Sequence, residues 1–193
     1  GERIKMTQKR NLSTEKIIEV AKEIINKEGA EKLSFSKVAG VLGVHSQAMY
    51  PYFADKEELK IAVINDFLDS LTEQIKKELQ GISGKEALRI YGRKLHELLL
   101  IQPRLTRLAF GGIDYSQKEE ARNHFKDLVE LLESLIEPFT KNDVDVINRA
   151  RLYRAVIFGY AQNELWGLFK LALVPAQMSF EFTLEEAIAT ITA

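Results

Sequence analysis

Residues 33–59 read LSFSKVAGVLGVHSQAMYPYFADKEEL, and this stretch decides the fold. Apolar residues at helical spacing predict a helix over 35–42, with Ser34 at its N-cap. Gly43 can adopt the left-handed conformation that a tight turn between helices requires, and a second, short helix is predicted to begin near Ser46. Two helices joined in this way form a helix-turn-helix, whose second helix can enter the major groove of DNA.

The second helix is predicted to bury Met49 and Phe53 and to expose its remaining side chains. Most of these are small or able to hydrogen-bond, which suits the reading of base edges. An aromatic corner of the core, without a role in DNA binding, is the alternative interpretation of the aromatic residues. The set predicted to face outward is His45, Ser46, Gln47, Ala48, Tyr50 and Tyr52.

Pro51 is unusual in a recognition helix. It lacks an N–H, and its ring collides with the carbonyl four residues back, that of Gln47. It also disfavours helical geometry at Tyr50. We therefore predict a short recognition helix with a loosened final turn.

Helical spacing continues through the rest of the chain. Ser13 and Gly29 are predicted to bound the first helix, and Asp55 with Glu58 forms a capping box for a helix that extends to about residue 80. No segment shows the alternation of a strand, so the predicted fold is all-α, with about nine helices. The remaining predicted helices span 85–101, 104–110, 117–138, 143–173 and 184–191.

The composition is that of a globular protein, with 46% hydrophobic and 28% charged residues among 193. Cysteine is absent, which excludes disulfides and thiolate metal sites and fits a cytoplasmic protein. The basic start of the chain does not have the pattern of a signal peptide. The net charge is −1, but residues 1–56 hold ten Lys and Arg against seven Asp and Glu, which suits DNA binding at this end.

Residues 155–174 form the most apolar stretch of the chain. A membrane-spanning helix needs about 18 or more apolar residues with few charges. Glu164 and Lys170 interrupt this stretch. We therefore expect a helix that is buried in the core and in a subunit interface, and no membrane association.

The helix-turn-helix resembles that of the TetR family of transcriptional regulators. The matching features are a first helix that ends at a glycine, the pair Gly43 and Val44 between two helices, and the residues Tyr50, Phe53, Lys56, Glu57, Glu58 and Leu59. The resemblance implies a DNA-binding domain with a basic arm at 1–55 and a ligand-binding and dimerisation domain at 56–193. It also implies that Tyr50 and Lys56 contact phosphates. Ser34, Ser36 and Lys37 complete the predicted DNA-binding set.

Two C-terminal segments are similar to one TetR subgroup. They read IQPRLTRLAFGG and RLYRAVIFGYAQNELWGLF, and the subgroup has His-Gly where this chain has Phe158 and Gly159. The resemblance implies that the helices predicted at 143–173 and 184–191 form a homodimer. Two recognition helices about 34–36 Å apart then bind a pseudo-palindromic operator in double-stranded DNA.

By the same resemblance, the C-terminal domain binds a small-molecule effector, which acts as inducer or as corepressor. Effector pockets are mostly apolar with a few polar groups. Core packing is the alternative role for each aromatic candidate, and Arg107 pairs either with an anionic effector or with Glu97. We favour an apolar, fairly large effector. The candidate residues are Tyr91, His96, Arg107, Phe110, Phe125, Tyr160, Asn163 and Trp166.

No motif of an enzyme is present in the sequence. It has no glycine-rich phosphate loop and no nucleophile elbow, and its three histidines, His45, His96 and His124, are dispersed. His96 and Glu97 are adjacent and face different sides of a helix, which does not suit a metal site. We expect no enzymatic activity, metal or cofactor. The alternative to a DNA-binding regulator is a helical ligand-binding or adaptor protein without specific DNA binding.

Overall fold

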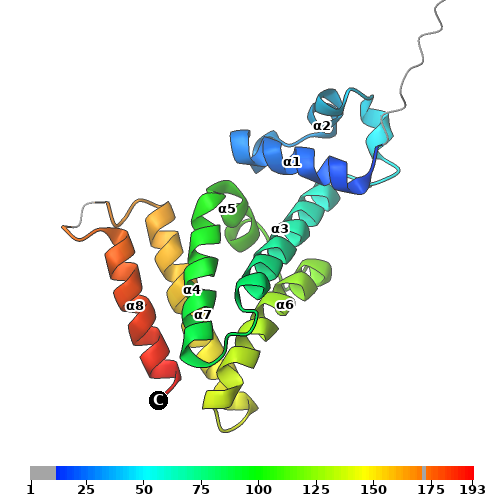
Figure 1. Ribbon diagram of the computed structural model, residues 1–193. Coiled ribbons are helices and arrows are strands. Elements are labelled where there is room, and N and C mark those ends of the chain that lie inside the picture. The colour runs from blue at the N-terminus through cyan, green and yellow to red at the C-terminus, as the bar shows by residue number, and fades with distance from the viewer. Residues whose placement is uncertain (1–11, 171–172) are drawn as a thin grey trace, which may run out of the picture. The chain divides into compact units, whose positions relative to one another are not determined.

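The computed structural model describes residues 12–170 and 173–193, and all regular secondary structure in these ranges is helical (Figure 1). The prediction of an all-α fold is confirmed. The residues pack as two units, one ending at Val63 and the other beginning at Ile64. This boundary lies inside α3 (Lys56–Glu78), eight residues after the division that the sequence suggests.

The N-terminal unit begins with α1 (Thr14–Glu28), whose two ends are as predicted. The Ser13 hydroxyl accepts a hydrogen bond from the Lys16 N–H at 3.3 Å, and this satisfies a donor of the first turn that has no partner within the helix. At the other end Gly29 has a φ of 98°, which favours glycine, and its N–H bonds to the Ile25 carbonyl. A single 3₁₀ turn, η1 (Ala30–Lys32), then leads to the next helix.

The first helix of the predicted motif, α2 (Phe35–Leu42), also has the expected bounds. The Ser34 hydroxyl accepts from the Lys37 N–H at 3.2 Å. Gly43 ends the helix in the left-handed conformation, at φ 68° and ψ 35°, and the following N–H, that of Val44, returns to the Ala39 carbonyl at 3.0 Å. The tight turn is therefore built as its sequence predicts.

The second element of the motif is shorter and tighter than predicted. Only the four residues of η2 (Ser46–Met49) are helical, as one 3₁₀ turn. Tyr50 keeps helical backbone angles, φ −62° and ψ −26°, so the expectation that Pro51 displaces it from helical geometry is wrong. The proline lies in the turn that follows, and the N–H groups of Tyr52 and Phe53 both bond to the Met49 carbonyl.

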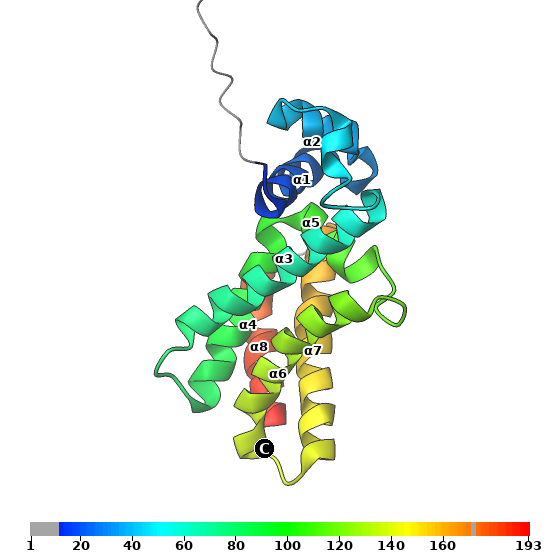
Figure 2. The same ribbon diagram turned by 90° about the vertical axis from the view of Figure 1, so that its right-hand side faces the viewer.

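The C-terminal unit is a bundle of antiparallel and crossing helices (Figures 1 and 2). In this bundle α4, α7 and α8 contact one another in pairs, and α6 packs against both α4 and α7. Large buried side chains such as Tyr91, Tyr153 and Phe180 fill the space between them. After α3, the helices are α4 (Gly84–Ile101), α5 (Pro103–Gly111), α6 (Glu119–Ile136), α7 (Asp143–Leu165) and α8 (Ala176–Ile191), with the 3₁₀ turn η3 (Glu137–Phe139) before α7.

The helix predicted at 143–173 ends at Leu165, eight residues early. The cause is Gly167, whose φ of 75° makes it the left-handed residue of a helix terminus. Its N–H bonds to the Glu164 carbonyl at 2.9 Å, and the Leu168 N–H bonds to the Asn163 carbonyl at 3.0 Å. The apolar residues around this glycine hide the stop signal in the sequence.

The last helix begins at Ala176, directly after Pro175, and not at residue 184 as predicted. Apolar and polar residues alternate from Met178 to Thr183, which obscures the helical period. Phe180 is buried whereas Phe182 is 69% exposed, so the two aromatic residues lie on opposite sides of one helix.

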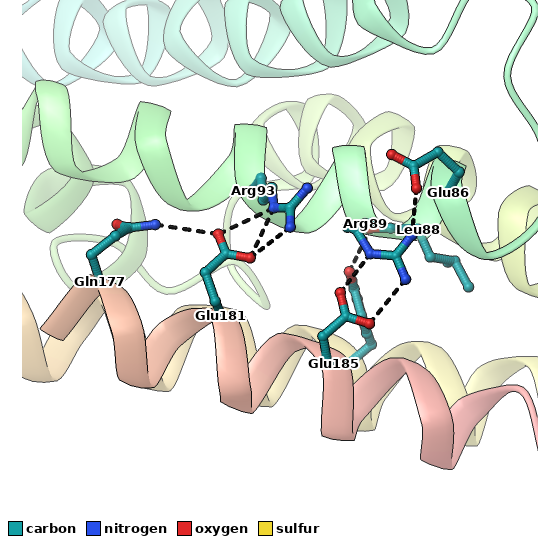
Figure 3. Close-up of polar contacts among 8 residues, drawn as sticks. Glu86, Leu88, Arg89, Arg93, Gln177, Glu181 and Glu185 are labelled. Atoms are coloured by element: carbon teal, nitrogen blue, oxygen red, sulfur yellow. Dashed lines mark hydrogen bonds and ion pairs between the residues drawn. The ribbon is translucent and has the colours of Figure 1, made fainter.

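Ion pairs attach α8 to α4 along their exposed edge (Figure 3). Arg89 donates to Glu185 at 2.9 Å and also pairs with Glu86, and Arg93 donates to Glu181 at 2.7 Å. Hydrogen bonds from Arg89 hold the pKa of the Glu185 carboxyl below its ordinary value.

Within the described residues, no helix is long and apolar enough to cross a membrane.

Candidate nucleic-acid interface and effector site

We call residues 45–50, which are η2 and its two capping residues, the recognition turn. Its exposed residues are His45, Gln47 and Tyr50. Tyr50 is 60% exposed, and its ring lies edge-on against Phe35 with centroids 5.2 Å apart. This contact orients the ring while its hydroxyl end remains accessible. Ser46 and Ala48 were expected to face outward, but both are half-buried.

Tyr52 does not face outward as predicted. It is half-buried, and its hydroxyl donates to the Leu12 carbonyl at 3.0 Å. The side chain therefore links the end of the recognition turn to the start of α1. Because the Tyr52 hydroxyl already donates its hydrogen bond within the N-terminal unit, a structural role is favoured for this residue.

The three candidates on α2 and its N-cap differ in their availability. The Ser34 hydroxyl accepts the capping hydrogen bond from Lys37, and Ser36 is exposed. The Lys37 ammonium pairs with Glu28 of α1. A phosphate would have to compete with this carboxylate for Lys37.

Lys56 is the first residue of α3 and is exposed. The acidic residues next to it are occupied: Asp55 accepts from the Glu58 N–H at 2.9 Å, and Glu57 pairs with Lys60 at 2.9 Å. Glu58 in turn accepts from the Ala54 N–H, one residue before the position expected in a capping box. Lys56 has no ion pair among the residues that the structure describes, so its charge is available at a helix N-terminus, where anions bind well.

Among the effector candidates, Tyr91 of α4 is a core residue. It is fully buried, and its hydroxyl donates to the Leu128 carbonyl of α6 at 3.0 Å. Burial raises its pKa strongly. This hydrogen bond satisfies the one polar group of the side chain and fixes α4 against α6.

His96 and Tyr160 belong to a second cluster, at the contact of α4, α7 and α8. His96 is 2% exposed, pairs through Nε2 with Glu164, and stacks on Phe180 with centroids 3.6 Å apart. The carboxylate that pairs with His96 therefore comes from α7, and not from the adjacent Glu97. The Tyr160 hydroxyl donates to the Ala176 carbonyl at 2.6 Å. A groove of about 410 Å³ passes this cluster, lined by Arg93, His96, Glu97, Leu100, Ile101, Gln177, Phe180 and Glu181.

Three candidates lie near the C-terminal end of α7. Arg107 donates to the Leu165 carbonyl at 2.7 Å and not to Glu97, and its pairing with an anionic effector stays a prediction. The Asn163 side chain donates to the Gly159 carbonyl one turn earlier, at 2.6 Å. Trp166 is 62% exposed and lies beyond the last residue of the helix, so it does not line a bundle interior as expected.

Phe110 and Phe125 are part of a cluster of four half-buried aromatic rings, from α5, α6, α7 and the α5–α6 loop. Between ring centroids, Phe110 lies 4.6 Å from Phe158 and 6.0 Å from Phe125, and Tyr115 lies 5.3 Å from Phe125. The Tyr115 hydroxyl donates to the Ala109 carbonyl, and burial raises the pKa of Tyr115 to about 12. We call Phe110, Tyr115, Phe125 and Phe158 the aromatic cluster.

Arg154 of α7 was missed by the sequence analysis. Its guanidinium carbon lies 5.5 Å from the centroid of the Phe125 ring, and its buried Nε has no hydrogen-bond partner. The sequence does hold a signal, because Arg154 precedes the apolar residues 155–161 and lies one helical turn before Phe158.

Among the described residues, no group of three or more His, Cys, Asp or Glu side chains could hold a metal ion.

Residues 17–63, which include most of α1, all of α2 and the recognition turn, match the family model for bacterial regulatory proteins of the tetR family. This part of the chain is therefore similar to the TetR family of bacterial regulatory proteins. The matched region contains all the exposed residues of the recognition turn and Lys56. These residues therefore lie in the region that the family model covers.

The similarity to TetR-family proteins extends past this domain. The fatty acid metabolism regulator protein of Bacillus subtilis strain 168 is 25% identical over 148 residues, 74% of this chain and 76% of the relative. The solved structure of FadR from Bacillus subtilis in complex with stearoyl-CoA has a TM-score of 0.73 at 19% identity, over 92% of this chain and 98% of that one. A protein of unknown function from Rhodococcus sp. RHA1 has a TM-score of 0.83 at 15% identity, over 96% and 100%. Both solved structures therefore have the same fold as this chain.

Proposed function

We propose that this chain is a TetR-family transcriptional repressor that binds operator DNA as a homodimer and is controlled by a small-molecule effector. One observation supports the proposal most: the recognition turn exposes His45, Gln47 and Tyr50, and Lys56 follows with an available charge at the start of α3. A protein with this function works in the cytoplasm, where the bacterial chromosome lies.

The exposed groups suit two kinds of DNA contact. The Gln47 amide can donate and accept, which matches the paired groups on the major-groove edge of adenine. Lys56 supplies a positive charge to a phosphate, and the Tyr50 hydroxyl can donate to another. Base contacts of this kind give sequence preference, and phosphate contacts give affinity that depends on salt.

Exposed apolar side chains on α7 and α8 support the homodimer. Leu152 of α7 is 40% exposed, and Met178 and Phe182 of α8 are 64% and 69% exposed. Gly159 lies about two turns after Leu152 on the same side of α7. It is exposed and has open space where a Cβ would lie. A small residue there allows close approach of another helix. Covering such side chains with a second copy removes apolar surface from water.

The effector acts by binding one state of the repressor better than the other. To release DNA, it must bind the DNA-incompetent state more tightly, because equal affinity for both states shifts no equilibrium. The FadR structure was solved with stearoyl-CoA, which has a long apolar chain and anionic phosphates. The aromatic cluster and Arg154 offer complementary chemistry in this chain.

The proposal is tested by footprinting the purified protein on DNA from upstream of its own gene. We expect protection of one site with two-fold symmetric halves about one helical turn apart. Protection that covers the fragment uniformly, or no protection at any protein concentration, would instead favour an adaptor without specific DNA binding.

A further inference from the structure

Arg154 is buried in part without the partners that a guanidinium normally has. Its Nε lies out of contact with solvent and makes no hydrogen bond, and it pairs with no carboxylate among residues 12–170 and 173–193. Its positive charge is close enough to Tyr91 to oppose the rise in that tyrosine's pKa. A buried donor without an acceptor is destabilising and rare in native proteins, so each one needs an explanation.

Other arginines of the same unit show the ordinary arrangement. Arg89 and Arg93 bind glutamates of α8 through two nitrogens each (Figure 3). Arg149, one and a half turns before Arg154 on α7, binds Asp145 at 2.9 Å and the Ile191 carbonyl at 2.7 Å. Within residues 12–170 and 173–193, Arg154 has no such carboxylate partner, and its guanidinium lies over the face of the Phe125 ring, which attracts a cation.

The surroundings of Arg154 are apolar and aromatic. The centroid of the Phe125 ring lies 5.5 Å from the guanidinium carbon, and Phe110, Tyr115 and Phe158 continue the surface with centroid separations of 4.6 to 6.5 Å. All four residues are half-buried, so part of each stays accessible to solvent. Apolar walls with one charged group are typical of sites for amphipathic molecules.

We infer that Arg154 and the aromatic cluster form the effector site, and that the effector is an apolar molecule carrying a carboxylate or a phosphate group. The oxyanion accepts hydrogen bonds from the guanidinium of Arg154, including its Nε–H. The apolar body lies against the four rings. This inference rests on the proposed function for its regulatory meaning, but the binding site can be tested separately.

The test compares three ten-carbon probes with the full-length protein: decanoate, decyl phosphate and decanol, each below its aggregation concentration. Calorimetric titration gives the affinities. We expect at least one anionic probe to bind about 10- to 100-fold more tightly than decanol, which corresponds to a charge-assisted hydrogen bond. A preference for decanoate or for decyl phosphate identifies the carboxylate or the phosphate as the group recognised.

Arg154→Met removes the charge and keeps an apolar stem. It should reduce binding of the anionic probes to the level of decanol and leave decanol binding unchanged. The melting temperature without ligand should stay the same or rise, because the variant removes an unsatisfied buried donor. Arg154→Lys keeps the charge without the planar fork, and should bind the anions with intermediate affinity.

Lys126→Met is the matched control. Lys126 neighbours Phe125 on α6 but is exposed and paired with Glu130, so its loss should change probe binding by less than about twofold. Two outcomes would overturn the inference. In one, the wild type binds the anions no better than decanol; in the other, the Arg154→Met protein melts at a lower temperature and loses affinity for decanol as much as for the anions.

Operator binding of ligand-free Arg154→Met should equal that of wild type. Failure of operator binding in both proteins contradicts the proposed function and leaves the site intact.

Discussion

Gln47 and Lys56 are both exposed, but they offer DNA different chemistry. Gln47→Ala should weaken binding to the operator by about 1–3 kcal/mol and leave non-specific binding almost unchanged. Lys56→Ala should weaken binding to every sequence and flatten the dependence of log affinity on log salt by about one unit per subunit. Fluorescence anisotropy with operator and scrambled DNA at several salt concentrations separates the two effects. Equal losses on both DNAs for Gln47→Ala would contradict its role in reading bases.

Tyr50 and Tyr52 lie two residues apart and should respond differently to loss of the hydroxyl. Tyr52→Phe removes the hydrogen bond to the Leu12 carbonyl and should lower the free energy of unfolding by about 1 kcal/mol. Tyr50→Phe is the matched control, because its ring is exposed, and it should retain stability but bind DNA more weakly. Urea unfolding measures the first effect and anisotropy the second. A stable Tyr52→Phe protein with impaired DNA binding would reverse the assignment.

Local backbone roles could be predicted from single residues, whereas long-range partners could not. Ser13, Ser34 and Gly43 act within five residues of themselves, so their chemistry fixes their structural role. Tyr52 bonds to a residue 40 positions away, and the Arg154 Nε is buried without a hydrogen-bond partner. Such facts require the packed structure.

At the scale of elements, Gly167 sets where α7 ends. Gly167→Ala should cost about 1 kcal/mol of stability, because an alanine strains a residue at φ 75°. Gly40→Ala is the matched control, since Gly40 lies inside α2 with open space around it and an alanine there should stabilise by roughly 0.5–1 kcal/mol. Thermal unfolding compares the two. A stabilised Gly167→Ala protein would mean that α7 continues past Leu165.

The attachment of α8 to α4 should depend on pH. Because Arg89 lowers the pKa of Glu185 in the folded chain, the pair stabilises the fold above the ordinary carboxyl pKa of 4.5 and loses this effect as pH falls through the lowered value. Glu185→Gln should therefore be less stable than wild type at neutral pH, and the difference should vanish in acid. Urea titrations at several pH values test this. A difference that persists at pH values where the carboxyl is protonated would exclude the ion pair as its cause.

Most elements could be predicted because their periodicity and caps agree. The two errors share a cause: Gly167 lies among large apolar residues, and the start of α8 alternates apolar and polar side chains. In both places the local pattern conflicts with the packing. The 3₁₀ turn at Ser46–Met49 was closer to prediction, since Pro51 indicated a short element, but the helix type depends on the bonds from the Ala48 and Tyr50 N–H groups to carbonyls three residues back.

At the scale of the whole molecule, the exposed apolar residues of α7 and α8 predict a homodimer. Phe182→Glu should convert a particle of twice the chain mass into one of single mass, because it places a charge in an apolar interface. Val41→Glu is the matched control, since Val41 is 58% exposed on α2 and its replacement should not change the mass. Light scattering coupled to size exclusion gives both masses. A dimeric Phe182→Glu protein would place the interface elsewhere.

The all-α architecture and the DNA-binding domain could be predicted because the helix-turn-helix is a local pattern of 27 residues. The effector candidates could not be sorted in this way. Tyr91 and His96 prove to be tied to α6 and α7, whereas Phe110 and Phe125 form a partly open surface with Arg154. Only the three-dimensional arrangement separates side chains that hold the bundle together from those that remain available.

The central claim, that the recognition turn reads a specific operator, is tested most directly by anisotropy with DNA from upstream of the gene and a scrambled duplex of the same composition. At physiological salt, we expect the upstream DNA to bind at least about 1000-fold more tightly, with both affinities falling steeply as salt rises. Equal affinity for the two duplexes at every salt concentration would contradict the claim.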